Sequence, residues 1–171
     1  QLLWLNIVTD GLQDLALSFE KAEDGITEEM PRSTKESLFN KELFTEVMIS
    51  GFLIGIVVFI VFVKLLNSGM DIETVRGYIL MLMVFMQNIH VLNCRSEKLS
   101  VFKVSIKKNP FIIFSIVGAI VLQIIMMEVP VLATFLQTNS IPIIEIIKLF
   151  LYSLIVLIVM EIYKFIRYRK R

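Results

Sequence analysis

The sequence predicts an all-α integral membrane protein: a helical bundle of five transmembrane helices, with a cytoplasmic loop after the first. Three observations predict this fold class. The 171-residue chain is 56% hydrophobic, and its mean hydropathy of +0.76 is well above that of a soluble domain. The apolar residues form runs close to the roughly 20 residues that a helix needs to cross a bilayer. Most basic residues lie between these runs, as expected for the connections between transmembrane segments. We expect the segments to be helices, because a helix satisfies every backbone polar group inside a membrane.

Each predicted span is an apolar run that ends at polar or turn-forming residues. The second run closes at Lys64, and Pro110 suits the first turn of the fourth helix. Short connections on the outer side make neighbouring helices antiparallel. The whole chain, residues 1–171, is expected to form one transmembrane domain. Its predicted spans are residues 2–19, 46–66, 75–92, 110–128 and 141–164.

The distribution of charge predicts the orientation of the bundle. An odd number of spans places the two ends of the chain on opposite sides of the membrane. All but three of the 17 Lys and Arg residues lie in residues 20–46, 93–110 and 164–171. The exceptions are Lys64, Arg76 and Lys148. The positive-inside rule therefore predicts a cytoplasmic C-terminus.

Several functions are disfavoured by what the sequence lacks. Cys94 is the single cysteine, which excludes a disulfide framework and a cysteine metal site. There is no phosphate-binding glycine loop, no catalytic Ser/His/Asp pattern and no nucleic-acid signature. We expect no hydrolytic activity from this chain alone and no nucleic-acid partner. Because it opens inside a polar-striped helix without Met or a signal peptide, we expect a fragment of a longer protein.

The first span carries the best candidate site. Asn6, Thr9, Asp10, Gln13 and Asp14 recur at helical spacings of three and four, so they form one oxygen-rich stripe. Carboxylate, amide and hydroxyl oxygens are ligands of hard cations, and an acid at membrane depth is usually functional. We predict an ion site at Asn6, Thr9 and Asp10. Gln13 and Asp14 could form an entrance to the site or be structural. For the whole stripe, hydrogen bonding between helices is the alternative.

Two further residues bear on this site. Gly11 directly follows Asp10, where a local break in the helix could free backbone carbonyls to join the site. Gln87, well inside the third span, could supply a neutral oxygen to the same ion. A hydrogen bond to a neighbouring helix is an equal alternative for Gln87. His90 lies closer to the cytoplasmic interface and is expected to be a packed residue.

Four segments resemble cation-pumping P-type ATPases of the calcium-pump branch. Residues 1–12, QLLWLNIVTDGL, closely resemble the sixth transmembrane helix of those pumps, and residues 31–36, PRSTKE, resemble the cytoplasmic loop that follows it. Residues 86–93 with Ser96-Glu97 are similar to the eighth helix and its exit. Residues 161–166 are similar to the close of the tenth helix. The resemblance covers the whole chain in the right order.

The resemblance implies that the chain is the C-terminal transmembrane domain of a ten-helix pump, from the sixth to the tenth helix. Its partner would be the N-terminal part, with the first five helices and the cytoplasmic domains that use ATP and Mg²⁺. Asn6 and Asp10 would be Ca²⁺ ligands, with Asp10 shared where two sites exist, and Thr9 would serve the site that Asn6 does not. Residues 20–41 would couple the membrane helices to the phosphorylation domain.

Four positions bear on which ion the resemblance implies. Gln87 stands where reticulum-type calcium pumps have Glu, whereas plasma-membrane-type pumps, which move one ion per cycle, also have Gln. This favours one Ca²⁺, although Thr9 fits the two-site pattern. Asp14 adds an acid that could shift the choice of cation. Asn6 argues against sodium/potassium-type pumps, which typically carry Asp there.

The resulting hypothesis is the membrane portion of an ATP-driven cation pump that transports Ca²⁺, in a prokaryotic plasma membrane. The alternatives are a non-enzymatic membrane scaffold or channel-like subunit, or a pump for another cation such as Na⁺, K⁺, H⁺ or Mn²⁺. The lipid bilayer is the other expected partner.

Overall fold

The computed structural model describes residues 1–21 and 41–168, without the side chain of Glu42. Every regular element within these ranges is helical, which confirms the predicted all-α class. The predicted coupling loop lies mostly outside the described residues. The elements are α1 (Leu2–Val8), α2 (Asp10–Leu17), α3 (Lys41–Asn67), α4 (Ile72–Cys94), the 3₁₀ helix η2 (Ile106–Lys108), α5 (Phe111–Glu128), α6 (Pro130–Leu136) and α7 (Ile143–Tyr168).

Four helices in the described part of the chain are long and apolar enough to cross a membrane: α3 from Leu43, α4, α5 and α7. They coincide with the predicted second to fifth spans. Their ends carry the expected capping chemistry. Gly69, with φ of +82°, follows α3 in the left-handed conformation that glycine adopts most easily. The Asp71 carboxylate accepts the Thr74 N–H at 2.9 Å and caps α4.

The predicted first span, residues 2–19, is not one uninterrupted helix, and this part of the five-span prediction is therefore not confirmed. It consists of α1 and α2, which meet at Thr9 with φ of −102° and ψ of −73°. The N–H of Thr9 donates to the Leu5 carbonyl at 2.9 Å, and its hydroxyl donates to the same oxygen at 2.7 Å. Such back-bonding by Thr bends helices. The break lies at Thr9, and Gly11 is inside α2.

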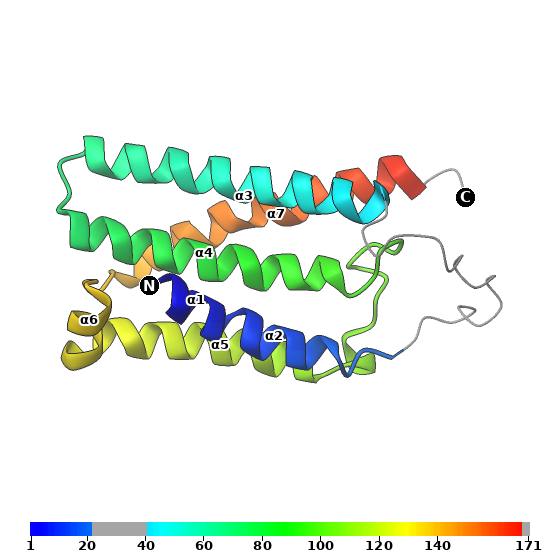
Figure 1. The fold of residues 1–171 in the computed structure, drawn as a ribbon, viewed down its shortest axis with the longest axis horizontal. Helices are drawn as coiled ribbons and strands as arrows, with labels where there is room; N and C mark the ends of the chain where they lie inside the picture. Colours follow the sequence, from blue (N-terminus) through cyan, green and yellow to red (C-terminus); the bar gives the residue numbers. More distant parts are fainter. Residues whose placement is uncertain (22–40, 169–171) are drawn as a thin grey trace.

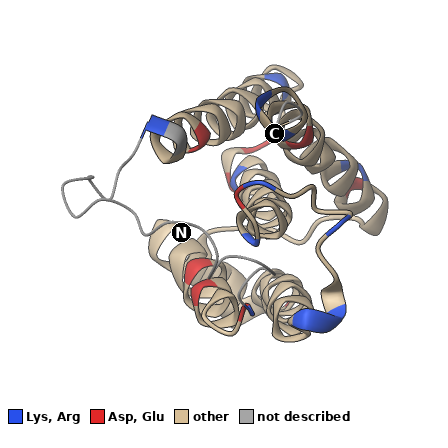
Figure 2. Cartoon of the chain, turned by 90° about the vertical axis from the view of Figure 1, so that its right-hand side faces the viewer, with Lys and Arg blue, Asp and Glu red and all other residues tan. Residues whose placement is uncertain are grey.

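Helix α4 is the centre of the bundle (Figure 1). Of its most apolar stretch 67% is buried, against 6% for α3, which is mostly exposed at the edge. Helices α3 and α7 pack on one side of α4, and α1, α2 and α5 pack on the other. Helices α2, α4 and α7 end, and α3 and α5 begin, at the same end of the bundle. We call this the basic end, because most described Lys and Arg lie there (Figure 2).

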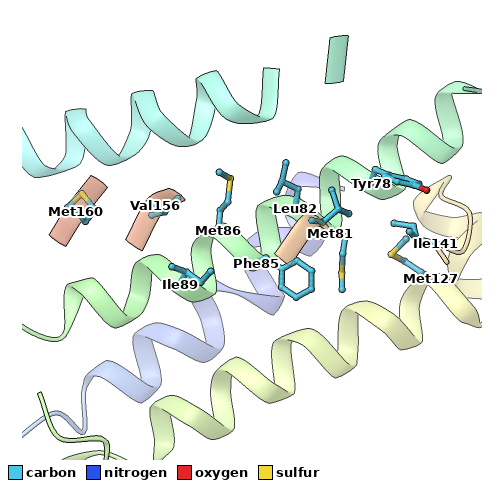
Figure 3. Close-up of a cluster of buried hydrophobic side chains, with 11 residues drawn as sticks. Tyr78, Met81, Leu82, Phe85, Met86, Ile89, Met127, Ile141, Val156 and Met160 are labelled. Atoms are coloured by element: carbon cyan, nitrogen blue, oxygen red, sulfur yellow. The ribbon is translucent and has the colours of Figure 1, made fainter. Parts of the chain in front are cut away.

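Buried side chains on two faces of α4 form the core. The largest cluster lies towards α7 and includes Met81, Phe85, Met86, Val156 and Met160 (Figure 3). At the end of the bundle opposite the basic end, α4 lies close against the connection between α6 and α7. A Cβ added at position 77 would lie 3.1 Å from the backbone oxygen of residue 139. Glycine at position 77 therefore permits this close approach.

The opposite face of α4 determines where α1 and α2 lie. Leu5 and Val8 of α1 pack with Leu80 and Val84 of α4. Nearer the basic end, Ala16 of α2 packs in a second cluster with Val91 of α4 and Ile112 of α5. These contacts hold both short helices in one groove between α4 and α5 and fix their rotation, which decides where the polar stripe points.

Candidate cation-binding site

The packing of α1 and α2 divides the polar stripe along its length. Thr9 and Gln13, one turn apart, are buried. Asn6, Asp10 and Asp14, also one turn apart from each other, are exposed. The stripe is thus a single face with one edge against the bundle and one edge open. The five residues stay together as predicted, but only two of them face the rest of this chain.

The buried edge contains a hydroxyl and an amide with different partners. Thr9 is fully buried. Its hydroxyl donates to the Leu5 carbonyl oxygen at 2.7 Å and lies 3.4 Å from Asp10 Oδ1. A hydroxyl that donates one hydrogen bond keeps lone pairs for a cation. Gln13 Nε2 instead donates to Asn88 Oδ1 at 2.7 Å, and Asn88 Nδ2 donates to the Val84 carbonyl at 2.8 Å. Gln13 is thereby part of a hydrogen bond between α2 and α4, and Asn88 is a partner that sequence reasoning missed.

The exposed edge presents oxygens to whatever lies outside this chain. The Asn6 side chain forms no hydrogen bond with any residue that the structure describes. Asp10 and Asp14 are carboxylates in the same line. A carboxylate facing hydrocarbon is strongly disfavoured, so acids in membrane helices face a protein interior or a polar cavity. Placed within a membrane, this edge would require a polar partner.

Gln87 lies on α4, beside the broken helix. It follows Leu80 by seven residues, so both lie on nearly the same face of α4, and Leu80 packs against α1. Gln87 is half-buried, and its buried Oε1 has no hydrogen-bond partner among the described residues. The structure does not join it to Asn6, Thr9 or Asp10 by a hydrogen bond. It offers a free neutral oxygen on the neighbouring element.

The ligand set within this chain is incomplete for a hard cation. Across residues 1–21 and 41–168, no group of three or more His, Cys, Asp or Glu side chains could hold a metal ion. Ca²⁺ takes about six to eight oxygens. Asn6, Thr9, Asp10 and Gln87 together offer fewer, so a cation held there needs oxygens from elsewhere.

A second polar cluster, at the basic end, has no counterpart in the predicted sites. Arg95 donates to both carboxylate oxygens of Glu20, at 2.8 and 2.9 Å. Asn109 donates to Glu20 at 3.0 Å and to the Ala16 carbonyl at 2.8 Å. Burial raises the pKa of Glu20, but the hydrogen bonds from Arg95 and Asn109 and the nearby positive charges outweigh it and lower the pKa overall. No local signal could identify this cluster, because its two charges lie 75 positions apart.

Comparison with known proteins places the whole chain in one family. The family described as cation transporting ATPase, C-terminus, matches residues 1–166. The calcium-transporting ATPase of Bacillus subtilis (strain 168) is 32% identical over 142 residues, which cover 82% of this chain and 16% of that protein.

Two eukaryotic relatives extend the match over nearly the full chain. The human calcium-transporting ATPase type 2C member 1 is 27% identical over 164 residues, covering 96% of this chain and 18% of that protein. The calcium-transporting ATPase 1 of Schizosaccharomyces pombe (strain 972 / ATCC 24843) is 28% identical over 170 residues, covering 99% of this chain and 19% of that protein. The chain spans less than a fifth of each of these three relatives. The predicted resemblance is confirmed, and the chain belongs to the family of the C-terminal region of cation-transporting ATPases.

Proposed function

We propose that this chain is the C-terminal membrane domain of an ATP-driven pump that transports Ca²⁺, and that it supplies part of the intramembrane ion site. One observation carries the proposal: a bundle of helices that are long and apolar enough to cross a membrane also contains a broken helix, and the exposed edge of that helix carries Asn6 and Asp10. The names of the relatives indicate the ion, since they are calcium-transporting ATPases.

In this proposal α1 and α2 together form the first of five spans. Residues 2–17 would extend about 24 Å at 1.5 Å per residue, close to the thickness of the hydrocarbon core. The break at Thr9 lies near the middle of that length. Broken helices at mid-membrane depth are where transporters expose backbone and side-chain oxygens to ions. The basic end would face the cytoplasm, in agreement with the positive-inside rule.

The proposed ligands are oxygen-bearing side chains at and beside the helix break, with one more on α4. Asp10 supplies the charge, Asn6 one turn earlier supplies an amide oxygen, and the Thr9 hydroxyl lies beside the carboxylate. Gln87 would add its unpartnered oxygen, and its lack of charge favours one Ca²⁺ per cycle. Asp14 lies one turn nearer the basic end, where it would line an entrance. The remaining oxygens would come from helices in the rest of the pump, whose cytoplasmic domains would use ATP and Mg²⁺.

Cation-dependent ATP hydrolysis by the complete polypeptide that carries this chain tests the proposal. Turnover is measured against a panel of cations, with Ca²⁺ at low free concentration, for the wild type and for Asp10→Asn. The substitution keeps the shape of the side chain and removes its charge. We expect Ca²⁺ activation in the wild type and its loss in Asp10→Asn.

Asp71→Asn is the matched control, because it makes the same chemical change at a helix cap where Asn serves as well as Asp. It should keep normal Ca²⁺ activation. Full activation in Asp10→Asn would overturn the site. Activation by another cation alone would retain the pump and change its ion, with Asp14 the first residue to test.

The scaffold alternative has one observation in its favour. Gln13 and Asn88 use their amides to join α2 to α4, which is how polar residues stabilise bundles without binding an ion. Absence of any cation-dependent turnover in the complete polypeptide would favour that alternative.

A further inference from the structure

The connection between α4 and α5, residues 95–110, is attached to the ends of the membrane helices along its length. Lys164 of α7 is buried, and its Nζ donates to the carbonyls of Asn93 at 2.7 Å, Ser96 at 2.6 Å and Leu99 at 3.2 Å. Three carbonyls at and after the end of α4 thus share one ammonium group. A positive charge at this position is favourable, because the C-terminal end of α4 carries the negative end of the helix dipole.

Two more contacts hold the second half of the connection. The Glu161 carboxylate of α7 accepts the Val101 N–H at 2.8 Å, and Arg95 donates to the Ser105 carbonyl at 3.0 Å. The connection begins directly after one span and ends directly before the next. It is therefore fixed at the level of the membrane surface and does not project into solvent as a free loop.

In its second half, residues 102–107, the connection exposes two apolar side chains, each next to a lysine. Phe102 is 80% exposed and Ile106 is 54% exposed, and each is followed at once by an exposed lysine, Lys103 and Lys107. Neither lysine forms an ion pair with any residue that the structure describes. The connection thus offers two pairs, each of one large apolar group and one uncompensated positive charge.

We propose that this surface, Phe102, Lys103, Ile106 and Lys107, binds anionic phospholipid headgroups. A side chain such as Phe102, held at the membrane surface, can bury its ring at the boundary between headgroups and acyl chains. Lysines at the same depth attract anionic lipid, and this attraction falls off over a Debye length, about 10 Å at 0.1 M salt, and weakens further as salt is added. Several of the Lys and Arg positions, coloured blue in the ribbon, lie at the outer rim of the bundle in this end-on view (Figure 2). This inference depends on the spans and not on which ion is transported.

Site-specific fluorescence in the complete polypeptide tests the depth of Phe102. Cys94→Ser removes the single cysteine of this chain, and any other cysteines of the complete polypeptide are replaced in the same way. A new cysteine, introduced by Phe102→Cys, is then the only site labelled with an environment-sensitive dye. In phosphatidylcholine nanodiscs containing phosphatidylglycerol, we expect quenching by a quencher attached near the lipid headgroup and little quenching by aqueous iodide. Strong iodide quenching alone would overturn the proposal. So would shielding from both quenchers, since that would mean that protein covers this surface.

The headgroup preference is tested separately with spin-labelled lipids. The measurement compares how strongly phosphatidylglycerol and phosphatidylcholine are immobilised by the protein. Lys103→Gln and Lys107→Gln should each lower the preference for phosphatidylglycerol roughly fivefold at low salt. The charge-retaining variants Lys103→Arg and Lys107→Arg are the matched controls and should keep it. An unchanged preference in the double Gln variant would overturn the proposal.

Discussion

Arg95 and Glu20 form a two-point ion pair that joins the exit of α4 to the exit of α2. Both guanidinium contacts are short, at 2.8 and 2.9 Å, and the side chains are 1% and 16% exposed. Such fork-to-fork pairs fix orientation as well as distance. Two residues of the candidate site lie on these same elements, Asp10 on α2 and Gln87 on α4. The pair therefore restrains how far these helices can slide past each other.

Removal of Glu20 should destabilise the bundle substantially. Glu20→Gln leaves the buried Arg95 without a counter-charge, and we expect a loss of about 2 to 3 kcal/mol in the free energy of unfolding, between values typical of exposed and of buried pairs. Chemical unfolding of the complete polypeptide in detergent measures this. The exposed pair Glu145–Lys148 is the control, because Glu145→Gln should change stability little. Equal losses in both variants would contradict this role for the Glu20 pair.

The same pair should make stability depend on acid pH. Because the folded-state pKa of Glu20 lies below its ordinary value of 4.5, its contribution is fully present above that value. It is lost as the pH falls through the lowered folded-state pKa. The stability difference between wild type and Glu20→Gln should therefore be constant near neutrality and shrink below about pH 4.5. A difference that stays constant down to strongly acid pH would mean that the carboxylate charge is not what stabilises the fold.

Gln13 can be tested as a packing residue by removing its amide. Gln13→Leu replaces the amide by an apolar side chain of similar size and leaves Asn88 Oδ1 without its donor. We expect a loss of about 1 kcal/mol in stability, with cation-activated turnover of the complete polypeptide retained. Loss of activation at normal stability would instead place Gln13 among the ion ligands or at their entrance.

Gln87→Glu tests whether the free oxygen on α4 faces the ion. A carboxylate added within a few ångströms of a bound cation should raise its affinity by roughly tenfold or more, even after part of the gain is lost to desolvation. It could also create a second site. Equilibrium binding of ⁴⁵Ca²⁺ reports both affinity and stoichiometry. With Gln87→Leu as the uncharged control, unchanged binding in both variants would leave Gln87 as a packing residue.

The parts of this fold that follow from local sequence were predictable. Apolar runs specify α3, α4, α5 and α7 because hydropathy is a property of each segment alone. The break at Thr9 depends on a side-chain hydroxyl that competes for the Leu5 carbonyl, and a hydropathy pattern does not register that. The short helix α6 is too brief for a periodic signal.

The polar stripe was predictable from residue spacing, but the burial of each of its residues was not. Spacing puts Asn6, Thr9 and Asp10 on one stripe, but only the packing of Leu5 and Val8 against α4 decides which edge is buried. Asn88 as the partner of Gln13 and Arg95 as the partner of Glu20 both depend on tertiary contacts over 75 positions. Long-range pairs of this kind leave no trace in local periodicity.

Lys164 offers a last test of how the membrane-surface connection is held. Lys164→Met keeps most of the apolar stem and removes the ammonium from the carbonyls of Asn93, Ser96 and Leu99. At about 1 kcal/mol for each lost hydrogen bond, we expect a loss of roughly 3 kcal/mol in stability. Hydrogen exchange should quicken at the amides of residues 95–105 before it does so in α4. Lys64→Met, at an exposed lysine of α3, should leave that exchange unchanged. If both variants exchange alike, the connection is held by its other contacts, those of Glu161 and Arg95.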